Sequence, residues 1–90
     1  MNGSFDKESL SPEEEERMAM EDDLEMLRED LIGELQAINQ YQEHIESLEG
    51  EESVGVLEHI IEEEKEHVAE LVKLIQNLDP VQAEKFKEIL

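Results

Sequence analysis

The sequence contains no cysteine, which removes a whole set of chemistries. Disulfide bonds, zinc–thiolate sites, iron–sulfur clusters and a thiol nucleophile are all excluded. Aromatic residues make up only 3% of the chain, and glycine and proline number four and two. Glutamate, leucine and isoleucine dominate instead, and because glutamate and leucine favour helices the composition predicts an all-α fold.

Positive charge and long apolar runs are also scarce. Seven basic residues stand against 27 acidic ones, so the formal net charge is −20. Such a charge argues against nucleic acid or anionic membrane as a partner and favours cations or a basic protein surface. No apolar run approaches the length of a membrane span, and the N-terminus lacks the apolar region of a signal peptide. We therefore expect a soluble, cytoplasmic protein with no nucleic-acid or membrane partner.

The length of 90 residues predicts one domain. We expect it to have three parts: a flexible acidic N-terminal arm or short helix over 1–22, a helical hairpin over 23–78, and a short C-terminal helix over 79–90. Within the first part, residues 1–10 lack any periodicity, which predicts disorder. Ser11 followed by Pro12 is a good start for a helix.

Turn residues mark the ends of the predicted helices. Gly50 is expected to adopt the left-handed conformation that ends the first helix of the hairpin. Ser53 is expected to cap the second helix, which would then begin just after it. Asp79 followed by Pro80 predicts the start of a last helix over about 80–89, with Asp79 as its N-cap.

Both helices of the hairpin carry an apolar seam, with residues at alternating steps of three and four over 24–48 and again over 57–78. This spacing is typical of a helix packed on other helices. Glu34, Glu64 and His67 occupy seam positions where the pattern predicts apolar side chains. An ionised carboxylate there is costly unless a cation or a full set of hydrogen bonds compensates it. Two carboxylates and an imidazole in one seam therefore indicate a metal ion.

The three polar side chains are also predicted to be level with one another. Residues equidistant from the loop of an antiparallel hairpin lie at one height, and the midpoint between Glu34 and the Glu64/His67 pair falls at Gly50. Glu64-x-x-His67 is the i, i+3 pair that bundle metal sites use. Carboxylate and imidazole ligands without thiolate suit iron or manganese, with zinc as a further substitute.

One chain supplies only half of a complete site. A di-metal carboxylate site in a helical bundle takes a Glu from each of two helices and a Glu-x-x-His from each of the other two. A hairpin of about 50 residues is also too small to bury a stable core by itself. Both arguments predict a homodimer that forms a ferritin-like four-helix bundle and binds metal through Glu34, Glu64 and His67.

Three neighbours of these ligands give weaker hypotheses. Tyr41 lies two turns after Glu34 on the same seam, and its hydroxyl either serves the site or is simply satisfied within the core. Glu63 lies one turn before His67 and is a candidate to orient its imidazole. His59 has acidic residues at helical spacing and is a candidate surface metal site, with a solvated helix face as the simpler interpretation.

Two segments of the chain resemble the encapsulated ferritins, which are half-length members of the ferritin-like superfamily. They are GELQAINQY at 33–41 and EEKEH at 63–67, and the resemblance extends over about 24–90. It implies two hairpins dimerising into a bundle, dimers joined into a ring that is typically decameric, and a di-iron ferroxidase centre at the dimer interface. The ligands it implies are Glu34, Glu64 and His67, with Tyr41 nearby.

The resemblance also implies residence inside an encapsulin nanocompartment, with the shell protein as partner. The chain departs from the family pattern at Gly33 and Gln36, where many relatives carry carboxylates proposed to guide ions inward. It departs again at Gln40, where a tryptophan often precedes the tyrosine. Family members often end in a shell-docking peptide or a fused shell protein, so the resemblance leaves open whether such a segment follows Leu90.

The sequence therefore predicts a ferroxidase that oxidises Fe(II) to Fe(III), with O₂ or peroxide as oxidant, for iron storage inside an encapsulin shell. One alternative is a rubrerythrin-like di-iron peroxide reductase, which would need an external reductant because a rubredoxin-type site needs cysteines. The other is a non-enzymatic acidic helical module that binds a basic partner. This last hypothesis predicts that leucine can replace the three polar seam residues without loss of function.

Overall fold

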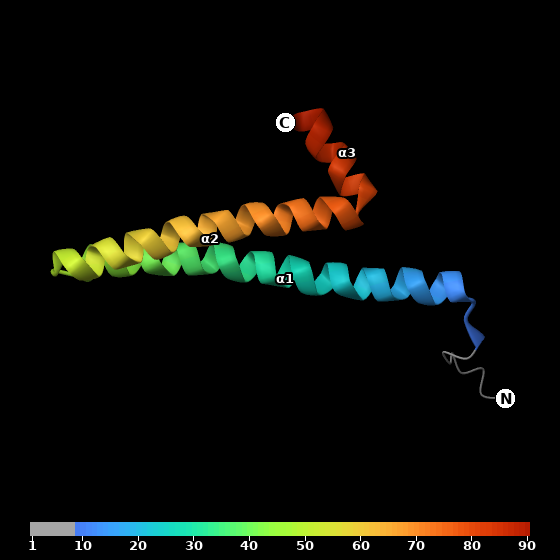
Figure 1. The fold of residues 1–90 in the computed structure, drawn as a ribbon, viewed down its shortest axis with the longest axis horizontal. Helices are drawn as coiled ribbons and strands as arrows, with labels where there is room; N and C mark the ends of the chain where they lie inside the picture. The colour runs from blue at the N-terminus through green and yellow to red at the C-terminus, as the bar shows by residue number, and fades with distance from the viewer. Residues whose placement is uncertain (1–8) are drawn as a thin grey trace.

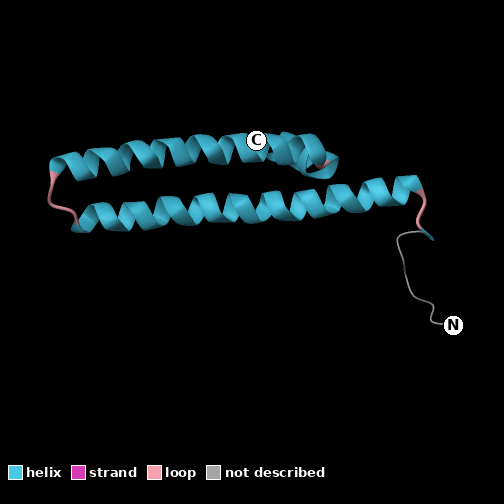
Figure 2. Cartoon of the chain, turned by 60° about the horizontal axis from the view of Figure 1, so that its bottom comes forward, coloured by secondary structure: helices cyan, strands magenta, loops and turns pink. Residues whose placement is uncertain are grey.

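The computed structural model describes residues 9–90, and this part of the chain consists of helices and short connections (Figure 1). The elements are α1 (Pro12–Ser47), α2 (Glu51–Leu78) and α3 (Pro80–Ile89). Residues 9–90 contain no strand, so the predicted all-α class is confirmed. Figures 1 and 2 show α1 and α2 side by side and antiparallel, as predicted for the hairpin.

The first helix is longer than the sequence pattern indicated. α1 runs unbroken from Pro12 to Ser47, so the boundary expected after residue 22 between an arm or short helix and the hairpin is wrong for the described part. No proline or glycine lies between Pro12 and Gly33. A helix continues through polar positions when nothing breaks it. The disorder predicted for residues 1–10 falls mostly outside the described residues.

A reciprocal pair of hydrogen bonds starts α1. The Ser11 hydroxyl accepts from the Glu14 backbone N–H at 3.1 Å, and the Glu14 carboxylate accepts from the Ser11 backbone N–H at 3.0 Å. This is a capping box, which satisfies two backbone donors that the helix itself leaves unpaired. The backbone N–H and then the hydroxyl of Ser11 lower the pKa of Glu14 by donating to its carboxylate. The predicted helix start at Ser11 is confirmed.

The loop of the hairpin differs from the prediction in two places. Gly50 has φ −79° and ψ 129°, which is ordinary extended backbone, so the left-handed conformation expected there is wrong. α2 already begins at Glu51 with Gly50 as its N-cap, and Ser53 lies inside the helix. The carboxylates of Glu51 and Glu52 favour an earlier start because they interact with the positive end of the helix dipole.

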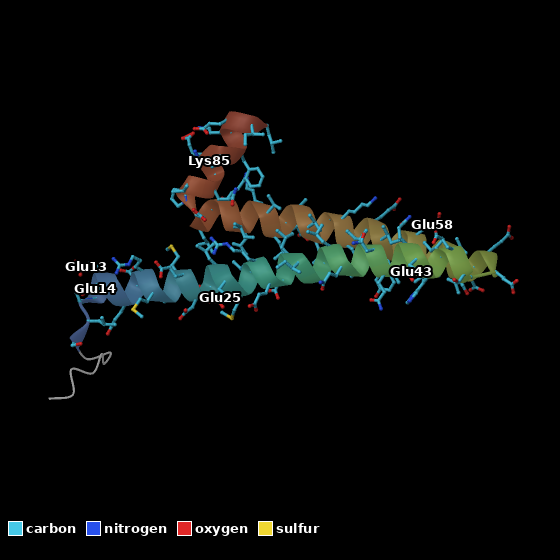
Figure 3. The ribbon with its side chains drawn as sticks, turned by 180° about the vertical axis from the view of Figure 1, so that it is seen from behind. Glu13, Glu14, Glu25, Glu43, Glu58 and Lys85 are labelled. Carbon is cyan, nitrogen blue, oxygen red and sulfur yellow. The ribbon has the colours of Figure 1, made fainter. Side chains whose placement is uncertain are left out.

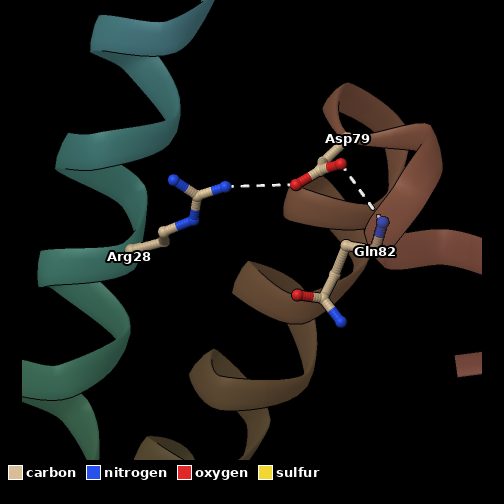
Figure 4. Close-up of polar contacts among 3 residues, drawn as sticks. All are labelled: Arg28, Asp79 and Gln82. Atoms are coloured by element: carbon tan, nitrogen blue, oxygen red, sulfur yellow. Dashed lines mark hydrogen bonds and ion pairs between the residues drawn. The ribbon is translucent and has the colours of Figure 1, made fainter. Parts of the chain in front are cut away.

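The junction between α2 and α3 follows the prediction. Asp79 Oδ1 accepts from the Gln82 backbone N–H at 3.1 Å and so caps α3. Asp79 Oδ2 meets Arg28 on α1 at 3.1 Å (Figure 4). The Asp79 carboxylate therefore caps α3 and joins this corner of the molecule to the first helix, while the Asp79 backbone N–H donates to the Ile75 carbonyl at the end of α2.

The molecule is thin and buries very little. Its extents are 66 × 35 × 16 Å and its radius of gyration is 19.6 Å, against about 12 Å for a compact domain of this length. Only Leu24, Ile61 and Ile75 are buried hydrophobic residues among those that the structure describes. Glu25, Glu43 and Glu58, which Figure 3 labels, are exposed. None of the described helices is long and apolar enough to cross a membrane.

Candidate metal centre

The three polar seam residues come together in space. Glu34 projects from α1, and Glu64 and His67 project from α2 one turn apart. Each offers one ligand atom, and the three atoms all lie within 4.8 Å of one another. His67 Nδ1 is 3.5 Å from Glu34 Oε1 and 3.9 Å from Glu64 Oε2. We call these three residues the triad. The three side chains thus lie at the same height along the hairpin, as the position of the loop predicted.

The triad sits at the edge of the seam, where the seam meets the surface. The side chains of Glu64 and Glu34 are 18% and 26% exposed, whereas that of His67 is 48% exposed. A single hairpin closes its seam only between its two helices, so a residue on the rim of the contact keeps one side open. All three residues were predicted at seam positions, and in the single chain the His67 side chain remains half-exposed there.

One triad atom is in an unfavourable environment. Glu34 Oε2 is buried and has no hydrogen-bond partner, and it is the only such side-chain atom in residues 9–90. A buried carboxylate oxygen without a partner costs free energy, and native structures rarely keep one without a reason. A cation bound between the triad side chains would satisfy this oxygen. The donor set of two carboxylates and one imidazole fits iron, manganese or zinc.

A surface groove of about 590 Å³ contains the triad. Three further carboxylates line it, those of Glu29, Asp30 and Glu70, which the sequence analysis did not single out. Asp30 lies one turn before Glu34 and Glu70 lies one turn after His67, so helical spacing from the triad could have identified these two from the sequence. The groove therefore has negative charge beside its ligands.

The remaining candidates do not join the triad. Tyr41 is half-buried on α1, about 10 Å along the helix axis from Glu34, and does not line the groove. Its role at the site stays a prediction. His59 Nε2 lies 3.6 Å from Glu63 Oε1 on the exposed face of α2. The Glu63 carboxylate thus pairs with His59, which contradicts the hypothesis that it orients His67.

The EncFtn-like family model matches residues 9–90. The chain is 42% identical over 62 residues to the encapsulin nanocompartment cargo protein EncC of Myxococcus xanthus, covering 69% of this chain and 48% of that protein. It is 41% identical over 64 residues to the ferritin-like-encapsulin shell fusion protein of Pyrococcus furiosus, covering 71% and 19%. The chain thus spans about half or less of the length of these relatives.

A solved structure shares the whole arrangement of helices. The crystal structure of protein ne0167 from Nitrosomonas europaea matches with a TM-score of 0.70 and 29% identity, over 99% of this chain and 91% of that one. The match covers nearly the whole chain and so includes the part of α1 before residue 23. The predicted relation to the encapsulated ferritins is confirmed, and the chain belongs to the EncFtn-like family.

Proposed function

We propose that this protein is a ferroxidase, which oxidises Fe(II) to Fe(III) at a di-iron site shared between two copies of the chain. The observation that carries the proposal is the triad, in which three ligand atoms from two helices converge within 4.8 Å. The buried, unpaired oxygen of Glu34 supports it, because a bound cation would remove that cost. Iron is here the substrate, and manganese or zinc would compete for the same ligands.

Two copies are needed because one triad is an incomplete set. Bundle sites of this class take four carboxylates and two imidazoles from four helices. One copy has two carboxylates and one imidazole on two helices, so a two-fold pairing supplies the full set. The Glu34 and Glu64 carboxylates and the His67 imidazoles of both copies would then hold the two ions.

The surface around the triad supports pairing at this place. Leu74 lines the triad groove and also a neighbouring groove that contains Met26. Leu74 is 41% exposed and Met26 is 56% exposed in the single chain. Exposed apolar side chains beside an incomplete polar site are typical of a surface that another subunit covers. Pairing would also give the thin hairpin the core that it lacks alone.

The ligands suit oxidation of iron. Carboxylates are hard anionic ligands, and they stabilise Fe(III) more than Fe(II). Two ferrous ions held together supply two electrons, which with two protons reduce one O₂ to hydrogen peroxide and leave two ferric ions. With peroxide as the oxidant, two electrons and two protons yield two waters. The chain holds and orients the ions, and its glutamates favour the more highly charged product.

The named relatives support storage inside a shell. One is a cargo protein of an encapsulin nanocompartment and the other is fused to an encapsulin shell. The proposal therefore places this protein inside an encapsulin compartment in the cytoplasm, where the shell encloses the ferric product. Dimers joined into a ring, typically a decamer in such proteins, would expose many sites to the same interior.

Anaerobic Fe(II) titration followed by native mass spectrometry tests the shared site. We expect one iron per chain, found only in assemblies with an even number of chains, because each pair of ions needs two triads. Zn(II) added first should reduce iron binding and the rate of oxidation in air, since zinc fits the ligands and has no redox chemistry. Iron bound by single chains at the same ratio would contradict the proposal.

A further inference from the structure

Two apolar residues of α2 stay exposed on the side of the helix that carries the triad. Val56 is 53% exposed and Leu74 is 41% exposed. Leu74 lines the triad groove together with His67. Val56 precedes Leu74 by 18 residues, which is about five full turns, so the two side chains lie on the same face of the helix. This face therefore has an exposed apolar residue near each of its ends.

The α2 residues of the triad lie midway between these two apolar residues. The midpoint of Val56 and Leu74 is residue 65, with Glu64 and His67 on either side of it. At a rise of 1.5 Å per residue, each apolar residue is about 13 Å from this centre along the helix axis. Val56 and Leu74 are thus placed symmetrically about the ligands that α2 supplies.

A partner hairpin that covers the triad groove can run in either of two directions. In the same direction, α2 packs on the partner's α1, and Val56 is level with the exposed His44, which is equidistant from the loop. In the reversed direction, α2 packs on the partner's α2, and Val56 meets Leu74 at both ends. Leu74 has an apolar side chain opposite it in both cases, since Met26 is level with it, whereas Val56 has one only in the reversed case.

The reversed direction also keeps the ligands together. Residues of α2 that are equidistant from its centre then lie opposite each other, so Glu64 of one copy faces His67 of the other. A slip of one helical turn would move the two triads about 5.4 Å past each other. That is more than the roughly 3.5–4 Å that separates two ions in a paired metal site, so the shared site needs a fixed register.

We propose that Val56 of one copy packs on Leu74 of a second copy, and that this contact, made twice, sets the direction and register in which the two triads meet. The groove of about 410 Å³ around Leu74 is also lined by Met26 and Leu78, which gives the valine side chain further apolar neighbours. Val56 and Leu74 are positioning residues that touch no ion. The inference rests on the proposed function for the pairing of the triads.

Introduced thiols test this contact directly, because the chain has no cysteine of its own. The double variant Val56→Cys/Leu74→Cys, oxidised with diamide in the presence of Mn(II) to fill the triads, should give a covalent dimer on a non-reducing gel. A disulfide requires Cα atoms about 4.4–6.8 Å apart, and within one chain the two positions are about 27 Å apart. Each single variant should give at least roughly ten-fold less covalent dimer, since each thiol then lies about as far from its own copy.

Val56→Cys/Lys73→Cys is the matched control. Lys73 precedes Leu74 in the sequence, but it is exposed and lines neither of the grooves that Leu74 lines. This variant should give no more covalent dimer than the single variants. Equal cross-linking of the control and of Val56→Cys/Leu74→Cys overturns the inference, as does the absence of covalent dimer from the latter. Efficient cross-linking of Val56→Cys alone also overturns it, because Val56 would then meet its own copy.

An exchange of charges measures whether the contact positions the ligands. Leu74→Glu should weaken the pairing, and the addition of Val56→Lys should lower the dissociation constant again by roughly ten-fold, which corresponds to about 1.4 kcal/mol. The rate of Fe(II) oxidation should recover with it. Ile32→Lys adds the same charge at a residue that is also 53% exposed but lies outside the triad groove, and it should restore neither property. An equal recovery with Ile32→Lys overturns the inference.

The failure of this inference differs from the failure of the proposed function. Wild-type protein that binds one iron per chain only in even-numbered assemblies, together with a Val56→Cys/Leu74→Cys variant that forms no covalent dimer, keeps the shared site and overturns the contact. Covalent dimers of this variant, together with wild-type protein that binds no iron, support the contact and count against the ferroxidase.

Discussion

Glu64→Leu is expected to abolish iron oxidation and, at the same time, to make the protein harder to unfold. The Glu64 side chain is 18% exposed within a seam that is apolar apart from the triad and Tyr41. Replacing a carboxylate there by leucine removes a desolvation cost of about 1–3 kcal/mol and adds apolar contacts. The rate of Fe(III) formation in air, followed by absorbance, should fall by more than roughly 100-fold, because even an outer partner of a metal ligand contributes 10–100-fold. Urea unfolding without iron should show the higher free energy of unfolding.

Glu63→Leu is the matched control for this prediction. Glu63 precedes Glu64 in the sequence, but its side chain is 54% exposed and pairs with His59 on the outer face of α2. The same chemical change there should leave the rate of oxidation within about two-fold of wild type, because a surface substitution away from the triad removes no ligand. A Glu64→Leu protein that oxidises iron as fast as wild type would favour the non-enzymatic acidic module instead.

Leu74→Glu is expected to separate the proposed dimer and to remove iron binding with it. Leu74 is 41% exposed in the single chain, so the hairpin should tolerate a charge there. In the pair, this position in the triad groove would bring two new carboxylates into an interface that is already acidic. We expect the dissociation constant to rise by roughly 100-fold, the effect of losing an interface hot spot of about 3 kcal/mol.

Sedimentation velocity and Fe(II) oxidation on the same samples measure both effects of Leu74→Glu. Ile32→Glu serves as control, because Ile32 is 53% exposed and lies outside the triad groove. That variant should keep both the pairing around the triad and the activity. Full oxidation by a monomeric Leu74→Glu protein would show that one chain is sufficient and that the shared site is wrong.

The triad was predictable because two independent features of the sequence, the spacing of the seams and the position of the loop, indicated the same three residues. The 3-4 spacing of the seams assigned Glu34, Glu64 and His67 to helix faces that meet, and the position of the loop made them level. Neither argument needed side-chain contacts, and the structure brings the ligand atoms together. Residue spacing does not predict how exposed each side chain is. The half-exposed state of His67 depends on how the two helices pack, so it became visible only in the structure.

The wrong predictions concern positions where the local sequence pattern was weak or where a competing interaction was stronger. Gly50 can adopt a left-handed conformation but does not have to, and a helix dipole that favours Glu51 and Glu52 moved the start of α2 ahead of Ser53. The residues before Leu24 show little apolar periodicity, yet they continue α1 because helix propensity and the Ser11 cap are sufficient. Pattern methods detect buried faces, and these residues bury none in the single chain.

The 16 Å thickness of the hairpin has a consequence for when its chemistry starts. A hairpin barely wider than one helix with its side chains keeps the triad close to the surface, with the His67 side chain half-exposed. Under the proposed function, a newly made chain therefore does not oxidise ferrous iron. It gains activity only when it pairs with a second copy. Oxidation would then begin only above the subunit concentration at which chains pair. The reaction of Fe(II) with O₂ or peroxide would therefore be confined to places where the protein has already accumulated.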